Sequence, residues 1–281
     1  MSKIAFIGVG NMGGAIARSV CRVTDPETVW VRNRRDETTA SIAAACGCNA
    51  AKDAAECAKD ADFVFLGVKP YAVRDVLRAI APVLTSRQVI VSMAAGVESA
   101  ALRDIVPDNP IVRILPNTPC AIGKGLMLIA PCGDVAQATI NALAALLAPC
   151  GRVGFTDETH ADAGMVIGGC TPAFTYQFIE ALADGGVLAG LPRADALSWA
   201  AQAVAGSAEL VLQSGKHPGQ LKDEVCSPGG STIEGVKALE ARAFRAGVLE
   251  AVEAAYEKNK ELGKYRNRGA YIEDRHLWRE L

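Results

Sequence analysis

Three glycines near the start of the chain have the spacing of a dinucleotide-binding turn. Gly8, Gly10 and Gly13 follow the apolar run Ile4–Ile7, and small and apolar residues at helical spacing come after them. In such a strand–turn–helix unit the first glycine forms the tight turn, the second admits a diphosphate, and the third lets helix and strand pack closely. The free N–H groups at the helix N-terminus bind the anion. A tight turn in another doubly wound domain is the alternative. The predicted cofactor contacts are Gly8, Val9, Gly10, Asn11, Met12 and Gly13.

The residues after the second predicted strand, Thr28–Val31, indicate which dinucleotide binds. A domain that prefers NAD has an acidic residue about 20 positions after the glycines, where it holds the ribose hydroxyls. This chain has Arg32, Asn33, Arg34 and Arg35 at that place. Guanidinium and amide groups suit a 2′-phosphate, which a carboxylate would repel. An exposed basic turn is the alternative. We expect NADPH, contacted by Asn33 and Arg34, with NADH as the other donor.

Two later strands are predicted to end at the same crevice. Asp62–Val68 and Gln88–Ser92 are apolar runs typical of strands covered on both faces. The carboxyl ends of such strands line the ligand site of a doubly wound sheet. Small residues at 93–96 allow a flat ring to lie there, while a proline is also a good first residue for a helix. The candidate cofactor contacts at these ends are Val68, Lys69, Pro70 and Ala95.

A second glycine-rich turn lies far along the chain, within residues 217–235 (HPGQLKDEVCSPGGSTIEG). Pro228–Gly230 is a turn, and Ser231–Glu234 has the spacing of a capping box at a helix start. Such a helix N-terminus, with hydroxyls beside it, can bind a small carboxylate. On the pattern alone, a helix cap without any ligand is favoured. His217, which precedes a proline, is interpreted as structural rather than as an acid.

The order of predicted elements indicates an α/β protein with two domains. Further strands are predicted at 111–115, 126–130 and 151–155, with helices at 38–46, 53–59 and 134–147, so strands and helices alternate to about residue 156. From residue 158 helical patterns replace the strands, at 173–188, 193–214 and 232–262, the last either continuous or bent near 243–247. We therefore expect a Rossmann-type doubly wound domain over 1–156 and an all-α domain over 157–281, with a C-terminal extension from about 263.

Composition limits the kinds of partner. The 281 residues include 29 basic and 31 acidic side chains, so bulk charge does not favour nucleic acid or a membrane surface. No apolar run has the length of a membrane span and no separate signal peptide precedes the first strand, so we expect a cytoplasmic protein. Nine cysteines suit reduced thiols. Cys46-Gly-Cys48 is too tight for an ordinary zinc pair, and no metal site is predicted.

The helical region predicts self-association. Helices that are apolar all round need more cover than one small domain supplies, and an interlocked homodimer would provide it. Packing against the nucleotide domain of the same chain is the alternative. The charged and aromatic tail, 263–281, would either dock on a partner subunit through Tyr271, Leu277 and Trp278 or be a frayed extension.

The chain to about residue 262 resembles the pyrroline-5-carboxylate reductase family. The resemblance rests on six segments in order: FIGVGNMGGAI at the start, FLGVKP at 65–70, SMAAGV at 92–97, RILPNTP at 113–119, GLPRADAL at 190–197 and HPGQLKDEVCSPGGSTIEGVKALE at 217–240. It implies a helical dimerisation domain after the Rossmann domain, and a homodimer or a higher oligomer built from dimers. It also implies NAD(P)H as hydride donor and 1-pyrroline-5-carboxylate as the acceptor, which is reduced to L-proline in the last biosynthetic step.

The resemblance also implies roles for individual residues. Backbone N–H groups of the loop would hold the substrate carboxylate, the Thr232 hydroxyl would face the ring nitrogen, and Lys69 and Ala95 would lie near the nicotinamide. We expect positioning catalysis in which Thr232 orients the imine and relays a proton from water. The substrate-binding residues so implied are Ser227, Gly229, Gly230, Ser231 and Thr232.

Some positions depart from the family pattern, and two other functions stay open. The family usually has a serine-rich run where this chain has Gly168–Ala173, and the Asp53 segment lacks a common asparagine. One alternative function is reduction of a related cyclic imine acid, and another is NADPH binding by a regulatory protein without turnover. A hydroxyacid dehydrogenase would need a lysine in the 173–188 helix, which has none.

Overall fold

The computed structural model describes residues 3–267, and its chain divides into two compact units. One unit comprises Met1–Cys170 with the segment from Ala255 onward, and the other is Thr171–Ala254. The domain limits predicted from the sequence, at residues 156 and 157, stay a prediction. The part of the tail that carries Tyr271, Leu277 and Trp278 lies outside the described residues.

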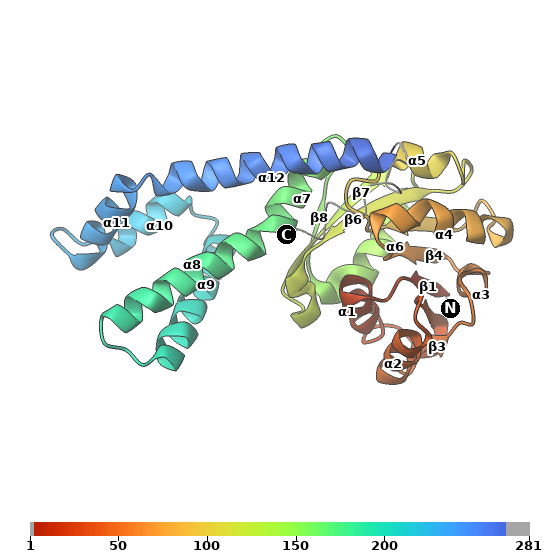
Figure 1. Cartoon of the computed structure of the whole chain (residues 1–281), viewed down its shortest axis with the longest axis horizontal. Helices are drawn as coiled ribbons and strands as arrows, with labels where there is room; N and C mark the ends of the chain where they lie inside the picture. Colours follow the sequence, from red (N-terminus) through yellow and green to blue (C-terminus); the bar gives the residue numbers. More distant parts are fainter. Residues whose placement is uncertain (1–2, 268–281) are drawn as a thin grey trace, which may run out of the picture. The chain divides into compact units, whose positions relative to one another are not determined.

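The first unit is built on an eight-stranded sheet of order β3-β2-β1-β4-β5-β6-β7-β8 (Figure 1). Neighbouring strands are parallel except for the antiparallel pair β6–β7. The chain moves outward in one direction from β1 and then in the other from β4, which places a topological switch point between these two strands. The strands are β1 (Ile4–Ile7), β2 (Val29–Arg32), β3 (Asn49–Ala50), β4 (Phe63–Leu66), β5 (Val89–Ser92), β6 (Ile111–Pro116), β7 (Gly125–Cys132) and β8 (Gly151–Phe155).

Helices cover both faces of this sheet, which confirms the doubly wound fold. One hydrophobic core lies under α1 (Asn11–Val20), α2 (Asp36–Cys46) and α6 (Gln137–Leu147). A second core lies under α3 (Ala54–Ala58), α4 (Val73–Ile80) and α5 (Ser99–Arg103). The central strands are buried on both faces, which is why their sequences are continuous apolar runs. Short 3-10 helices occupy Pro26–Thr28, Pro70–Ala72, Ala81–Val83, Thr118–Ile122 and Ala148–Cys150.

Glycine backbones make a very close contact at the turn between β1 and α1. A Cβ atom on Gly13 would lie 2.1 Å from the carbonyl oxygen of Gly8, and one on Gly67 would lie 2.3 Å from the same oxygen. Gly8 has a φ of +98° and its Cβ would lie 2.5 Å from the carbonyl carbon of Gly67. Only glycine fits such a contact, because no flexible side chain is present to move aside. The contact brings the start of α1 against the ends of β1 and β4.

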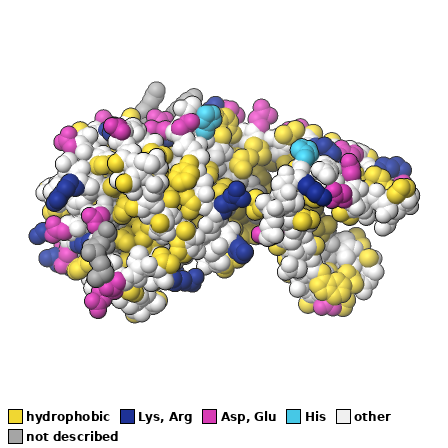
Figure 2. All heavy atoms as spheres, turned by 180° about the vertical axis from the view of Figure 1, so that it is seen from behind, with side chains coloured by type: hydrophobic (Ala, Val, Ile, Leu, Met, Phe, Trp, Pro, Cys, Tyr) yellow, Lys and Arg dark blue, Asp and Glu magenta, His cyan; other side chains and the backbone are white. Residues whose placement is uncertain are grey.

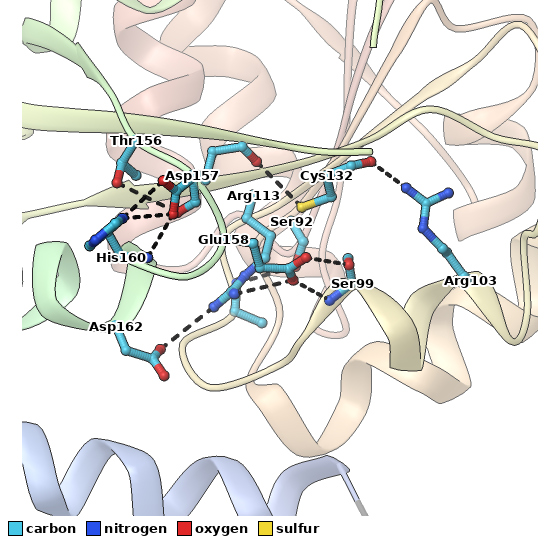
Figure 3. A network of polar contacts seen from close by, with 12 residues as sticks. Ser92, Ser99, Arg103, Arg113, Cys132, Thr156, Asp157, Glu158, His160 and Asp162 are labelled. Carbon is cyan, nitrogen blue, oxygen red and sulfur yellow. Dashed lines mark hydrogen bonds and ion pairs between the residues drawn. The ribbon is translucent and has the colours of Figure 1, made fainter. Parts of the chain in front are cut away.

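An ion pair between a buried arginine and half-buried carboxylates fixes the loop that follows β8 (Figure 3). Arg113 on β6 is 3% exposed, and its guanidinium lies 3.4 Å from the carboxylate of Glu158 and 3.9 Å from that of Asp162. The Ser99 N–H donates at 2.7 Å to Oε1 of Glu158, the oxygen that Arg113 also contacts, and the Ser99 hydroxyl donates at 2.6 Å to Oε2. Burial acts to raise the pKa of Glu158, but the bonds from Ser99 and the charge of Arg113 outweigh it, so this pKa is lowered.

The remaining helices follow this loop. The third long helix predicted from the sequence is two helices, because the chain breaks at Ala243, a non-glycine residue with a φ of +53°. The helix over 218–225 and the turn of π-helix over 166–170 were not predicted. The helices are α7 (Ala161–Met165), a π-helical segment (Val166–Cys170), α8 (Thr171–Leu188), α9 (Arg193–Ser214), α10 (Pro218–Val225), α11 (Ser231–Ala241) and α12 (Phe244–Asn267).

The second unit leaves many apolar side chains open to solvent. Within Thr171–Ala254 the buried residues are two alanines, Ala183 and Ala196. Figure 2 shows yellow hydrophobic side chains on its surface at the right of the view. The helices of this unit do not bury these apolar groups against one another, and large exposed apolar surfaces of this kind are typical of interfaces. The exposed apolar side chains of this unit include Leu188, Trp199, Leu210, Leu212, Val225 and Leu249.

Among residues 3–267, no helix combines the length and the hydrophobicity needed to cross a bilayer.

Substitution of Gly13 should destabilise the fold. We expect Gly13→Ala to lower the free energy of unfolding by about 3 kcal/mol, the upper end of overpacking costs, because its Cβ would meet the Gly8 backbone. Thermal and urea unfolding at fixed protein concentration measure this change. Gly10→Ala is the matched control: its Cβ would meet no atom within 4 Å, so its cost should stay under about 1 kcal/mol. Equal costs for the two variants would contradict the close contact.

The Glu158 network should make stability depend on pH. Because the folded state lowers this pKa, Glu158 stabilises the fold above about pH 4.5, its ordinary pKa, and this stabilisation disappears as the pH falls through the lowered value. We expect Glu158→Gln to lower the Tm near neutral pH. The difference in Tm between this variant and the wild type, the Tm gap, should narrow below about pH 4.5. Asp108→Asn, at an exposed carboxylate, is the control. A gap that is constant with pH would contradict the role of the charge.

Candidate functional site

A cleft of about 960 Å³ opens at the carboxyl ends of β1, β2, β4 and β5. Its size is that of a pocket for a large organic ligand. It lies at the switch point between β1 and β4, where doubly wound sheets bind dinucleotides. The cleft lies within the first unit. Its lining residues are Gly8, Gly10, Asn11, Met12, Asn33, Arg34, Arg35, Gly67, Val68, Lys69, Pro70, Tyr71, Ala72, Met93, Ala94 and Ala95.

Most of the predicted cofactor residues meet in this cleft. The two that do not line it are Val9, which is 1% exposed, and Gly13, which is buried against Gly8. These two residues shape the turn behind the cleft. The structure thus brings together residues from four strand ends that the sequence analysis assigned one at a time.

The start of α1 forms the anion-binding part of the cleft. Gly10 is the N-cap of α1 in extended conformation, with no side chain to satisfy the first N–H groups of the helix. It is exposed, and a Cβ placed on it would meet nothing within 4 Å. The open space beside unsatisfied N–H donors is what a diphosphate requires. The arrangement therefore fits the dinucleotide predicted from the glycine spacing.

Basic side chains stand at the β2 end of the cleft. Arg34 and Arg35 are exposed and line the cleft beside Asn33. Arg32 has other partners: its guanidinium lies 2.7 Å from the Asp36 carboxylate and donates to the Ala51 carbonyl oxygen at 3.4 Å. The β2 end of the cleft, which we call the basic corner, thus offers two arginines rather than three to a phosphate group. Among residues 3–267, no carboxylate side chain lines this cleft, so the described lining has no group that would repel a 2′-phosphate.

Several lining residues were missed by the sequence analysis. Gly67 lies in the tight contact behind the cleft, and Tyr71 and Ala72 follow the predicted Lys69–Pro70 pair. Met93 and Ala94 belong to the run of small and flexible residues after β5, of which Ala95 alone was chosen. The signal for all of these was their position within one turn after a buried strand, the same signal that pointed to their neighbours.

The second candidate site is the loop before α11, in the second unit. Gly229 has a φ of +69°, and the N–H of Gly230 donates to the Ser227 carbonyl oxygen at 3.0 Å, so residues 227–230 form a closed turn. Ser227 and the start of α11 are exposed. The turn leaves the first N–H groups of α11 directed away from any helical acceptor.

The capping box predicted at Ser231–Glu234 does not form. Gly230 is the N-cap of α11 and makes no side-chain hydrogen bond, while Ser231 is the first residue of the helix. The Glu234 carboxylate accepts from Lys237 at 3.1 Å rather than from the N-cap backbone. The Ser231 and Thr232 hydroxyls therefore do not cap the helix. This argues against the alternative that the turn is a helix cap without a ligand.

His217 has a structural contact, in line with its interpretation from the sequence. It is the N-cap of α10, and its Nδ1 accepts from the N–H of Gly219 at 3.0 Å. This contact holds the imidazole ring at the start of α10 through Nδ1.

The segment that departs from the family pattern, Gly168–Ala173, begins in a π-helical turn and continues into α8. Val166–Cys170 follows α7, and the Asn117 amide donates to the Gly168 carbonyl oxygen at 3.0 Å while its own oxygen accepts from the Leu126 N–H at 2.9 Å. Gly168 lies close to the Leu126 side chain, and a Cβ atom on Gly168 would lie 3.4 Å from it. A π-helical turn is often found at functional sites.

Two family models match the chain. The model described as pyrroline-5-carboxylate reductase dimerisation matches residues 158–262. The model described as NADP oxidoreductase coenzyme F420-dependent matches residues 3–96.

Whole-chain comparisons agree with these models. Pyrroline-5-carboxylate reductase of Escherichia coli is 40% identical over 265 residues, which cover 93% of this chain and 98% of the relative. The enzyme of Glycine max is 38% identical over 92% of this chain and 95% of its own length. A solved structure from Plasmodium falciparum, with NADP bound, has a TM-score of 0.82 at 32% identity, covering 93% of this chain and 98% of the other. One from Coxiella burnetii has a TM-score of 0.87 at 29% identity, with the same coverage. With this identity along nearly its whole length, the chain belongs to the pyrroline-5-carboxylate reductase family.

Proposed function

We propose that this chain reduces 1-pyrroline-5-carboxylate to L-proline with NADPH as the hydride donor. The observation that carries the proposal is the pairing of two features in a chain of this family: a dinucleotide cleft with a basic corner, and an uncapped Ser-Thr helix start preceded by a glycine turn. The NADP-bound relative from Plasmodium falciparum supports the choice of cofactor. The proposed reaction is the reduction of a C=N bond.

The cleft residues would hold the cofactor by their chemistry. The N–H groups at the start of α1 would bind the diphosphate beside Gly10, and Asn33 with Arg34 would bind the 2′-phosphate. Val68, Lys69, Pro70 and Ala95 would line the nicotinamide end. When bound, NADPH supplies a hydride.

The loop before α11 would hold the substrate. The exposed N–H groups after Ser227, through Gly229, Gly230 and Ser231, suit a carboxylate at a helix N-terminus. The Thr232 hydroxyl would orient the ring nitrogen and relay a proton from water. A protonated cyclic imine is already a strong electrophile, so positioning supplies much of the catalysis and no strong acid is needed. The scheme assigns no step to His217, whose Nδ1 accepts from the Gly219 N–H at the start of α10.

We infer that the chain acts as a homodimer, or as an oligomer built from dimers. The apolar side chains of α8 and α9 are exposed in one chain, and the dimerisation model covers these helices. Burial of such faces against a second copy would remove them from water.

Two alternatives differ in what they would turn over. A related cyclic imine acid would use the same cleft and loop, whereas a regulatory NADPH-binding protein would bind without oxidation of the cofactor. Oxidation of a hydroxyacid is disfavoured, because α8 (Thr171–Leu188) contains no lysine that could act as a base.

Loss of NADPH absorbance with each substrate tests the reaction. We expect rapid oxidation with 1-pyrroline-5-carboxylate and slower oxidation with its six-membered homologue. Thr232→Val should lower kcat/KM about 10- to 100-fold, the range for a lost hydrogen bond to a charged group. Thr232→Ser keeps the hydroxyl and should recover most of the activity.

The outcomes separate the alternatives. Preference for the six-membered ring would favour the related imine acid, and no oxidation with either ring would favour the regulatory protein. Full activity of Thr232→Val would remove the role proposed for this hydroxyl while leaving the reaction itself intact.

Arg34 should set the preference for NADPH. We expect Arg34→Ala to raise the KM for NADPH about 10- to 100-fold, because a charge-assisted hydrogen bond contributes about 1.5–3 kcal/mol. The KM for NADH, which lacks the 2′-phosphate, should change little. Arg87→Ala, at an exposed arginine that does not line the cleft, is the control and should change neither value. Equal losses with both cofactors would contradict a phosphate contact at Arg34.

A further inference from the structure

Three cysteine thiols converge on the sheet face that α1 and α2 cover. Cys21 caps the end of α1, Cys46 is the last residue of α2, and Cys48 lies just beyond it. Their Sγ atoms all lie within 4.8 Å of one another. All are free thiols and half-buried, so the cluster is reachable from solvent. The sequence analysis weighed the Cys46-Gly-Cys48 pair and predicted no metal site, because nothing in the sequence placed Cys21 beside it.

The backbone around these thiols is well fixed. Gly47 has a φ of +66° and turns the chain sharply between Cys46 and Cys48. The N–H groups of Gly47 and Cys48 both donate to the Ala43 carbonyl oxygen, which closes this turn on α2. The N–H of Cys21 donates to the Ala17 carbonyl oxygen at 2.9 Å, as the last turn of α1. The thiols are thus presented by two helix ends rather than by a loose loop.

These thiols differ from the buried cysteines of the same unit. Burial raises the pKa of the Cys57 thiol to about 12 and that of Cys150 to about 11, as for inert core cysteines. Cys21, Cys46 and Cys48 are instead half-buried, and their Sγ atoms lie close enough together to share one ion. Thiols placed in this way can exchange their protons for a cation.

We propose that Cys21, Cys46 and Cys48 form a binding site for a soft d¹⁰ metal cation, Zn²⁺ or Cu⁺. Thiolates select these ions over hard cations such as Mg²⁺ or Ca²⁺, which require oxygen ligands. With a metal–sulfur bond of about 2.3 Å, sulfurs in a planar three-ligand site lie about 4.0 Å apart. The thiols need to move by less than about 1 Å to reach that geometry. The partial exposure of all three leaves room for a water as a fourth ligand of Zn²⁺.

This site is separate from the proposed reaction. α1 begins at the dinucleotide cleft and ends at Cys21, and its 10 residues span about 15 Å. A cation there would join the ends of α1 and α2 without touching the cleft. Failure of the metal proposal would therefore leave the proposed reductase activity unaffected, and the reverse also holds.

Metal titration of the reduced full-length chain, prepared without a polyhistidine tag, tests the site. Zn²⁺ in one arm and Cu⁺ without oxygen in the other are titrated in competition with a chromophoric chelator. We expect one ion per chain for at least one of the two metals. Cys21→Ser and Cys48→Ser should each weaken its binding by about tenfold or more, since losing a ligand costs at least as much as losing an outer partner. Cys170→Ser, at another half-buried cysteine, is the matched control and should leave binding unchanged.

X-ray absorption of the loaded chain provides the second readout. Three sulfur neighbours that fall in number in both variants would support the site, and the ion that binds identifies the metal. Binding that is equal in the wild type, Cys21→Ser and Cys48→Ser would overturn the proposal. Absence of binding by either ion would also overturn it, as would conversion of two cluster thiols to a disulfide in place of metal capture.

Discussion

The contact among the backbones of Gly8, Gly13 and Gly67 is the constraint on which the rest of the first unit depends. At each of the three positions a Cβ atom would lie within 2.5 Å of a backbone atom, so a side chain at any one would force β1, β4 and α1 apart. Their close approach sets where α1 begins and leaves Gly10 exposed beside unsatisfied N–H groups. The cleft then follows, because β1 and β4 are the strands between which the sheet reverses its order. The site is thus a consequence of packing, and the dinucleotide would bind where side chains are excluded.

Sequence patterns predicted the parts of this arrangement that are local. Short apolar runs gave the strands, and the residues after each run gave most of the cleft, because parallel strands deliver their carboxyl ends to one edge. Gly67 was missed because its role comes from the register of β4 against β1, with Ile7 opposite Leu66, which no local pattern contains. The run after β2 offers three arginines, and the sequence does not show which of them line the cleft. Arg32 pairs with Asp36 at the start of α2, so Arg34 and Arg35 are the two that line it.

The loop before α11 shows how a one-residue shift changes the meaning of a motif. The letters Ser-Thr-Ile-Glu satisfy the capping-box pattern, but Gly229 at positive φ lets Gly230 take the N-cap position instead. The helix therefore starts one residue earlier than the pattern assumes, and the hydroxyls fall within its first turn. A glycine at the N-cap stabilises a helix less than serine or threonine would, because it leaves the first N–H groups without a side-chain acceptor. A bound carboxylate could accept from these same N–H groups. Resemblance to a family gave the substrate, which the pattern by itself did not.

The cysteine cluster has the same origin as Gly67: residues distant in sequence that the fold brings to one place. Cys46 and Cys48 are visible as a pair, but Cys21 joins them only because α1 and α2 cover the same sheet face and end near each other. All three side chains are half-buried and pack against the core on this face. Packing alone does not require three sulfur atoms within 4.8 Å of one another. Their chemistry is what distinguishes them, and a soft cation is the ligand that this chemistry selects.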